Sequence, residues 1–231
     1  MNNIIVKHIP NTITSMNLLC GVLGVIASLN GRLELGFELM ILAAVFDFCD
    51  GLAARLLKAY SEIGKELDSL ADDVSFGVLP AVMLFSVSGT DIVVLKYLPL
   101  LLAVFSALRL AKFNLDERQS LGFIGLPTPA NALFWGSLMV GVAPHFESSP
   151  LWAVAMVVGV LVSSYLLVSE IPMFALKFKQ WGWKGNEVKY LFVISCIPLL
   201  ALLRISGIAV IIAWYVLLSA MVAKKPAPQN H

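Results

Sequence analysis

The feature that most constrains the fold of this 231-residue chain is a series of long apolar segments. They occupy residues 14–30, 33–57, 67–88, 92–112, 127–144, 150–171, 188–203 and 206–222. A helix needs about 20 apolar residues to cross the hydrocarbon of a bilayer, with a range of about 17–25. Hydrophobic residues make up 59% of the chain and charged residues 13%, whereas soluble domains average about 45–50% and about 25%. The sequence therefore predicts an integral membrane protein.

The fold class that follows is all-α, a polytopic membrane bundle of about eight transmembrane helices. Residues 188–222, which are divided near Arg204 and Gly207, can be interpreted in a second way. The minimum number of transmembrane helices is then six. We expect residues 1–225 to form a single membrane domain. Residues 226–231, which begin with Pro226, are expected to be a disordered tail.

The distribution of basic residues predicts the orientation in the membrane. With eight spans, only Arg32, Lys96 and Arg204 fall on one side. The other 13 of the 16 Lys and Arg residues fall on the opposite side: Lys7, Arg55, Lys58, Lys65, Arg109, Lys112, Arg118, Lys177, Lys179, Lys184, Lys189, Lys224 and Lys225. The side richer in Lys and Arg is normally cytoplasmic. We therefore expect a multi-pass protein of the cell (inner) membrane with both termini in the cytoplasm.

Composition also excludes some classes of function. The net charge is +1 and no basic cluster is evident, so nucleic acid is not expected as a partner. The three cysteines lack C-x-x-C spacing and fall in apolar segments, which favours simple packing over a zinc or redox site.

Four aspartates lie close together in this apolar chain. Asp47 and Asp50 are spaced i, i+3, and Asp68 and Asp72 are spaced i, i+4, so each pair projects from one face of a helix. Two antiparallel helices joined by a short turn would bring the four carboxylates to one point. Oxygen-only ligand sets suit Mg²⁺ or Mn²⁺ better than zinc. Carboxylates at bilayer depth are costly, and one or two divalent cations would offset that cost.

Two other interpretations of these carboxylates stay open at this point. They could make polar contacts between helices, or they could serve a proton- or cation-coupled transporter. With the predicted orientation, the aspartates face the cytoplasm around the turn at residues 58–65.

The aspartates belong to a longer pattern, D-x-x-D-G-x-x-A-R, eight residues, then G-x-x-x-D-x-x-x-D. It is formed by Asp47, Asp50, Gly51, Ala54, Arg55, Gly64, Asp68 and Asp72. This pattern resembles the signature of the CDP-alcohol phosphotransferases, membrane enzymes that make phospholipid head groups. The resemblance implies displacement on a CDP-linked lipid, in which an acceptor hydroxyl attacks phosphorus and CMP leaves.

The resemblance also implies roles for the aspartates. Asp47, Asp50 and Asp68 are the expected ligands of a metal site that holds two divalent cations, Mg²⁺ or Mn²⁺. Asp72 is the expected general base, and it is also expected to touch one metal ion.

A second group of residues is expected to bind the CDP-lipid. Gly51 and Ala54 are small, so they allow close approach of a ligand or of a neighbouring helix, and the resemblance assigns Gly51 to the nucleotide site. The planar guanidinium of Arg55 suits a phosphate or an acid. Family analogy places Ser61 beside the nucleotide lipid. Asn11 and Thr14 could cap the first helix, and the analogy places them against the CDP group.

The flanking sequence indicates the acceptor. Residues 17–21, 64–72, 74–77, 80–81, 108–114 and 125–130 resemble the membrane-spanning phosphatidylserine synthases of bacteria and archaea. The substrates implied are CDP-diacylglycerol and L-serine, with membrane lipids as surroundings and a homodimer as the assembly. Other acceptors, such as glycerol 3-phosphate or inositol phosphate, stay open as alternatives.

Four further residues are candidate contacts of the acceptor. Arg109 could bind its carboxylate or a lipid phosphate, or could simply extend toward the head groups. Ser75, Asn114 and Thr128 could supply hydrogen bonds. Asp73 departs from the resemblance, because an apolar or small residue is expected there. We expect it to support the neighbouring site or to pair with another helix.

Overall fold

The computed structural model describes residues 4–87, 92–116, 123–146, 150–174, 182–183 and 186–222. Its helices and strands follow in this order: α1 (Ile4–Leu29), α2 (Leu33–Leu57), α3 (Glu62–Asp72), the π-helix η1 (Asp73–Val78), α4 (Leu79–Val87), α5 (Val93–Tyr97), the 3₁₀-helix η2 (Leu98–Leu100), α6 (Leu101–Leu115), β1 (Phe123–Ile124), α7 (Thr128–Gly141), α8 (Ala143–Phe146), α9 (Pro150–Val168), β2 (Pro172–Met173), α10 (Glu187–Leu203) and α11 (Ser206–Val222). The helical fold class is confirmed. The predicted disordered tail, residues 226–231, lies outside the described residues.

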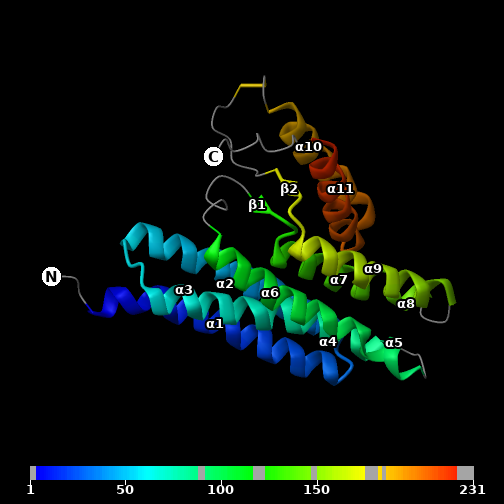
Figure 1. The fold of residues 1–231 in the computed structure, drawn as a ribbon, viewed down its shortest axis with the longest axis horizontal. Helices are drawn as coiled ribbons and strands as arrows, with labels where there is room; N and C mark the ends of the chain where they lie inside the picture. Colours follow the sequence, from blue (N-terminus) through cyan, green and yellow to red (C-terminus); the bar gives the residue numbers. More distant parts are fainter. Residues whose placement is uncertain are drawn as a thin grey trace, which may run out of the picture.

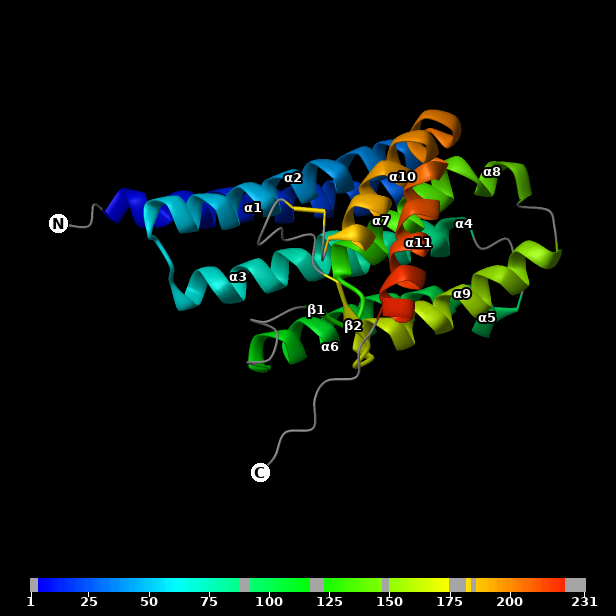
Figure 2. The ribbon, with the colours of Figure 1, turned by 90° about the horizontal axis from the view of Figure 1, so that it is seen from above.

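The first part of the chain forms a bundle of helices that run along its long axis. In Figures 1 and 2, α1, α2, the α3–α4 rod and α6 lie lengthwise, and the α2–α3 turn lies at the same end as the start of α1 and the end of α6. The turn between α1 and α2 lies at the opposite end. The α10–α11 hairpin is inclined to this axis in both views, and α11 packs on α7.

Four helical stretches in the described part of the chain are long and apolar enough to cross a membrane: His8–Leu29, Glu62–Val87, Val93–Leu115 and Leu151–Val168. Ser206–Val222 is a shorter apolar helix. The predicted helix ranges largely agree with the structure, but α1 begins at Ile4 rather than near residue 14. The total of eight spans stays a prediction, and so does the side of the membrane on which the termini lie.

The interior of the bundle is packed with large apolar side chains. Phe37 and Met40 of α2, Phe76 of η1, Leu79 of α4 and Trp135 of α7 all belong to this core. Because these residues come from helices distant in sequence, the core fixes α2 and the α3–α4 rod against α7.

A close contact joins α1 to η1 beside the aspartates. A Cβ atom on Gly21 would collide with the hydroxyl of Ser75, so glycine permits the two helices to approach. The Ser75 hydroxyl donates a hydrogen bond to the backbone carbonyl of Asn17, at 3.1 Å. This contact sets the position of α1 relative to the residues that follow Asp72.

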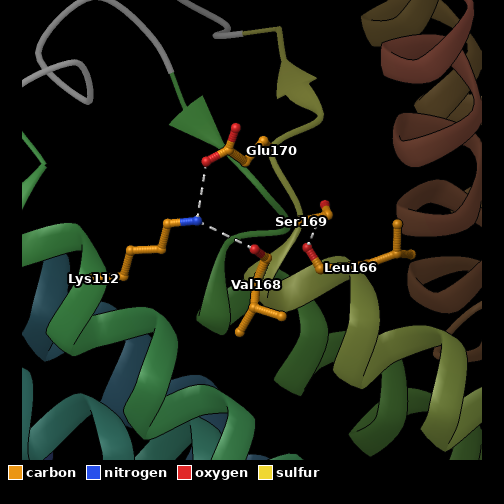
Figure 3. A network of polar contacts seen from close by, with 5 residues as sticks. All are labelled: Lys112, Leu166, Val168, Ser169 and Glu170. Carbon is orange, nitrogen blue, oxygen red and sulfur yellow. Dashed lines mark hydrogen bonds and ion pairs between the residues drawn. The ribbon is translucent and has the colours of Figure 1, made fainter.

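Two loops meet next to the end of α6. Strand β1 pairs with β2 antiparallel, and Gly125, with φ +75°, turns the chain after β1. Figure 3 shows Lys112 of α6 bridging to this region: its Nζ lies 3.4 Å from Oε1 of Glu170 and 3.5 Å from the carbonyl of Val168. The Ser169 hydroxyl donates to the carbonyl of Leu166 at 3.0 Å. The contacts of Lys112 tie the end of α9 to α6, one turn from Arg109.

Candidate active site

Three aspartates converge where α2 and α3 run antiparallel to each other. Asp47 and Asp50 of α2 and Asp68 of α3 each place a carboxylate oxygen within 4.8 Å of the others. The turn that brings them together is short. Lys58 takes a left-handed conformation (φ 52°) at the end of α2, and the Ser61 hydroxyl caps α3 by accepting a bond from the Gly64 amide at 3.0 Å.

This group of three carboxylates fits a divalent cation. All the ligand atoms are oxygens, which Mg²⁺ and Mn²⁺ prefer. Among the described residues, Oδ2 of Asp50 and Oδ1 of Asp68 are buried without a hydrogen-bond partner. Buried carboxylate oxygens normally have a partner, and a cation between α2 and α3 would supply it.

Asp72 lies one turn beyond Asp68 on α3, outside this group of three. Its side chain is 9% exposed, and its Oδ1 accepts a hydrogen bond from Nδ2 of Asn17 at 3.1 Å. Its charge interacts with those of the other three aspartates. Asp72 therefore lies outside the group of three carboxylates but close enough for its charge to interact with theirs.

A cavity of about 210 Å³ opens beside Asp50 and Asp68. It is lined by Pro10, Asn11, Thr14, Asp50, Gly51, Ala54, Ala59, Tyr60, Ser61, Gly64, Lys65 and Asp68. Five of the six residues predicted to bind the CDP-lipid are among them. The cavity and the carboxylate group are thus two parts of one site.

Gly51 faces open space in this cavity. A Cβ atom added there would meet no atom of the described residues within 4 Å. Close helix packing therefore does not require glycine at this position, and the space next to its backbone is available to a ligand.

Arg55 is the sixth predicted residue, and it lies outside the cavity. Its side chain is exposed, and its Nε donates to the backbone carbonyl of Gly51 at 2.9 Å. Lys65 and Tyr60 line the cavity instead, and the sequence did not single out either one. Lys65 also donates from Nζ to the carbonyl of Asn114 at 3.1 Å. The signal for Lys65 was its place directly after Gly64 in the signature.

Arg109 lies in the protein interior rather than extending toward the membrane surface. It is 7% exposed, its Nη1 donates to the Thr128 hydroxyl at 2.9 Å, and its charge interacts with that of Asp72. Arg109 and Thr128, two of the predicted acceptor contacts, are therefore brought together near Asp72.

The other two residues predicted to contact the acceptor each donate a hydrogen bond within the protein. Ser75 bonds to α1, as described above, and Asn114 donates from Nδ2 to the Ser69 hydroxyl at 2.8 Å. Asn17, the residue bonded to Asp72, entered the sequence analysis only as the first residue of the resembling stretch at residues 17–21.

Comparisons with known proteins agree with the geometry of the site. The family model described as CDP-alcohol phosphatidyltransferase matches residues 7–157. The chain is 35% identical over 169 residues to a Bacillus subtilis protein named CDP-diacylglycerol–serine O-phosphatidyltransferase, covering 71% of this chain and 89% of that protein. A Methanocaldococcus jannaschii protein of the same name is 33% identical over 165 residues, covering 71% and 75%. A Methanothermobacter thermautotrophicus protein named archaetidylserine synthase is 34% identical over 131 residues, covering 54% of each chain.

Proposed function

This chain belongs to the CDP-alcohol phosphatidyltransferase family, and from that premise we propose that it transfers the phosphatidyl group of CDP-diacylglycerol to the hydroxyl of L-serine. The products are phosphatidylserine and CMP. One observation carries the proposal: the cavity lined by predicted CDP-lipid contacts shares Asp50 and Asp68 with the carboxylate group. The relatives named as serine O-phosphatidyltransferases support serine as the acceptor.

The cavity receives the CDP part of the lipid. Ser61 and Gly64 form the first turn of α3, whose backbone amides favour an anion at a helix N-terminus. Lys65 adds a positive charge at the cavity wall. Gly51 leaves room for the ligand to lie against the backbone of α2.

Asp47, Asp50 and Asp68 hold the divalent cations that the donor set fits. Such cations, when bound, neutralise the pyrophosphate and stabilise the departing CMP. The choice between Mg²⁺ and Mn²⁺, and the presence of two ions, are part of this proposal. The protein's own contribution is to hold three carboxylates on two helices joined by one short turn.

Asp72 acts as the general base that takes the proton from the serine hydroxyl. Its separation from the other three carboxylates and its bond to Asn17 support this role. A positioned base contributes about 10²–10⁴ in rate. Arg109, buried beside Thr128 and interacting with Asp72, binds the serine carboxylate.

The enzyme works within a membrane, as its apolar helices indicate. We place the active site on the cytoplasmic face of the cell membrane, where nucleotide-activated lipid and serine are present. The basic residues around the α2–α3 turn support this orientation. We also expect a homodimer, which native mass spectrometry in detergent would test.

The proposal is tested by CMP release from the purified protein with CDP-diacylglycerol and Mg²⁺ or Mn²⁺. L-serine, glycerol 3-phosphate, inositol and inositol phosphate are compared as acceptors. We expect release with serine alone. Release only with another acceptor would contradict the serine assignment, and no release from folded protein with any acceptor would contradict the transferase activity itself.

A further inference from the structure

A second set of polar side chains lies beyond Arg109, with Asp73 half-buried and the other two fully buried, and the function proposed above does not use it. It consists of Asp73 in η1, Ser106 in α6 and Asn131 in α7. Ser106 and Asn131 are both 0% exposed. Within the part of the chain that the structure describes, no hydrogen-bond partner is present for Oδ1 of Asp73, Oγ of Ser106 or either polar atom of the Asn131 side chain.

Ser106 and Asn131 lie at the same depth, one helical turn from the Arg109–Thr128 bond. Helices α6 and α7 run in opposite directions, as Figures 1 and 2 show. Ser106 precedes Arg109 by three residues and Asn131 follows Thr128 by three, so each shares a helix face with its neighbour. Because Arg109 contacts Thr128 at 2.9 Å, we expect Ser106 and Asn131 to lie at the same level of the two helices, one turn from that bond.

Asp73, at the start of η1, lies close to Ser106. A Cβ atom on Gly77 would lie 2.7 Å from Oδ1 of Asp73 and 2.8 Å from Cβ of Ser106. The carboxylate of Asp73 and the side chain of Ser106 therefore meet above the bare backbone of Gly77. The π-helix that starts at Asp73 directs this carboxylate toward α6, whereas Asp72 contacts α1. Short π-helical segments often occur at functional sites.

The chemistry of this set is specific. Asp73, Ser106 and Asn131 together offer carboxylate, hydroxyl and amide oxygens as acceptors, and an ammonium group carries three donors. Polar groups buried without partners are unfavourable unless a ligand or water completes them. The neighbouring Arg109 has its own buried donor, Nε, without a partner among the described residues. A planar guanidinium edge of this kind suits a carboxylate.

We propose that Asp73, Ser106 and Asn131 form a subsite for the ammonium group of an α-amino acid acceptor whose carboxylate is bound by Arg109. This inference rests on the proposed function and adds to it the residues that select a zwitterion. Asp72, the proposed base for the acceptor hydroxyl, is the residue before Asp73, and the charge of Arg109 interacts with it. The carboxylate of Asp73 also disfavours an acceptor that carries a phosphate, because like charges would face each other.

The test compares wild type with Asp73→Asn, which keeps the size of the side chain and removes its charge. The expected result is a rise of about tenfold or more in the KM for L-serine, with an unchanged KM for CDP-diacylglycerol. Wild type is expected to have a higher kcat/KM for L-serine than for 3-hydroxypropionate, which lacks the ammonium group. In Asp73→Asn the ratio of these two kcat/KM values is expected to fall by about tenfold. Glu66→Gln removes an exposed carboxylate from α3 and serves as the matched control.

A second variant and a binding measurement keep the test independent of how Asp73→Asn folds. Ser106→Ala removes one acceptor and is expected to raise the KM for L-serine severalfold. L-serine is expected to raise the melting temperature of wild type in the presence of CDP and Mn²⁺, and to do so less for both variants.

Unchanged KM values for L-serine in both variants, with normal turnover by wild type, would overturn the ammonium subsite alone. Equal loss of activity toward L-serine and 3-hydroxypropionate would overturn it as well, because that result describes a packing role. Absence of wild-type turnover with L-serine would contradict the proposed function itself.

Discussion

Asn17 donates a hydrogen bond from its Nδ2 to Oδ1 of Asp72 across 3.1 Å, and it joins α1 to α3 inside the bundle. Asn17 is 0% exposed. Its backbone carbonyl is fixed separately, by the hydroxyl of Ser75. Asn17 is therefore a positioning residue, which holds the carboxylate of the proposed base in one orientation.

Replacing Asn17 with Leu removes this bond and keeps a side chain of similar size. A hydrogen bond to a charged group is worth about 1.5–3 kcal/mol, which corresponds to about 10- to 150-fold in rate. We expect kcat to fall within this range while the KM for CDP-diacylglycerol stays unchanged. Asn30→Ala is the control, because the side chain of Asn30, directly after α1, donates to the Ile26 carbonyl of that helix and is remote from Asp72. A normal kcat for Asn17→Leu would contradict the positioning role.

Asp47→Asn and Asp68→Asn each remove one charge from the group of three carboxylates. We expect the Mg²⁺ or Mn²⁺ concentration for half-maximal activity to rise by about tenfold or more in each variant, since metal sites lose at least this much even when supporting groups are removed. Titration of CMP release against the metal measures it. Glu38→Gln, at an exposed position on α2, should titrate like wild type. Unchanged curves for both Asp variants would refute the ligand assignment.

Two glycine substitutions should differ in their effects on stability and on the KM for CDP-diacylglycerol. Gly51→Ala meets open space in the protein, so the melting temperature should be unchanged or slightly higher, because alanine favours helix. The KM for CDP-diacylglycerol should rise, because the methyl group occupies space in the cavity. Gly21→Ala instead forces a Cβ atom onto Ser75 and should cost about 1–3 kcal/mol in stability. Thermal unfolding and substrate titration separate the two effects. An unchanged KM for CDP-diacylglycerol in Gly51→Ala would mean that the lipid does not bind in the cavity beside Gly51.

Labelling of single cysteines tests the orientation in the membrane. Tyr60 is 71% exposed beside the α2–α3 turn, and Asn30 is exposed at the opposite end of the bundle. In a background without native cysteines, Tyr60→Cys should react with an impermeant maleimide in inside-out vesicles, and Asn30→Cys should react in intact cells. The reverse pattern would contradict a cytoplasmic active site.

The sequence predicted the group of aspartates because their positions are set by helix geometry alone. Spacings of three and four residues place Asp47 with Asp50 and Asp68 with Asp72 on one face each. The turn between the two helices is short, so the faces had to meet. Ser61 was expected beside the nucleotide, and it lines the cavity and also caps α3.

Several side chains make contacts that the sequence did not predict. Arg55 bonds back to its own helix, although its spacing was correct for a ligand contact. Ser75 and Asn114 have the right chemistry for contact with the acceptor, and each donates one hydrogen bond within the protein, to Asn17 and to Ser69. Asn17 and Lys65 reach the site from segments that resemble the family but whose local pattern assigns neither residue a role. Such roles follow from tertiary packing, which spacing along one helix does not encode.

A paired measurement on Asp72→Asn tests most directly whether Asp72 is the general base of the transfer. Turnover with L-serine and binding of CDP-diacylglycerol are measured on the same preparation. Turnover is expected to be abolished while binding is retained, because Asp72 lies outside both the group of three carboxylates and the residues that line the cavity. Near-normal turnover by Asp72→Asn would contradict its role as the base.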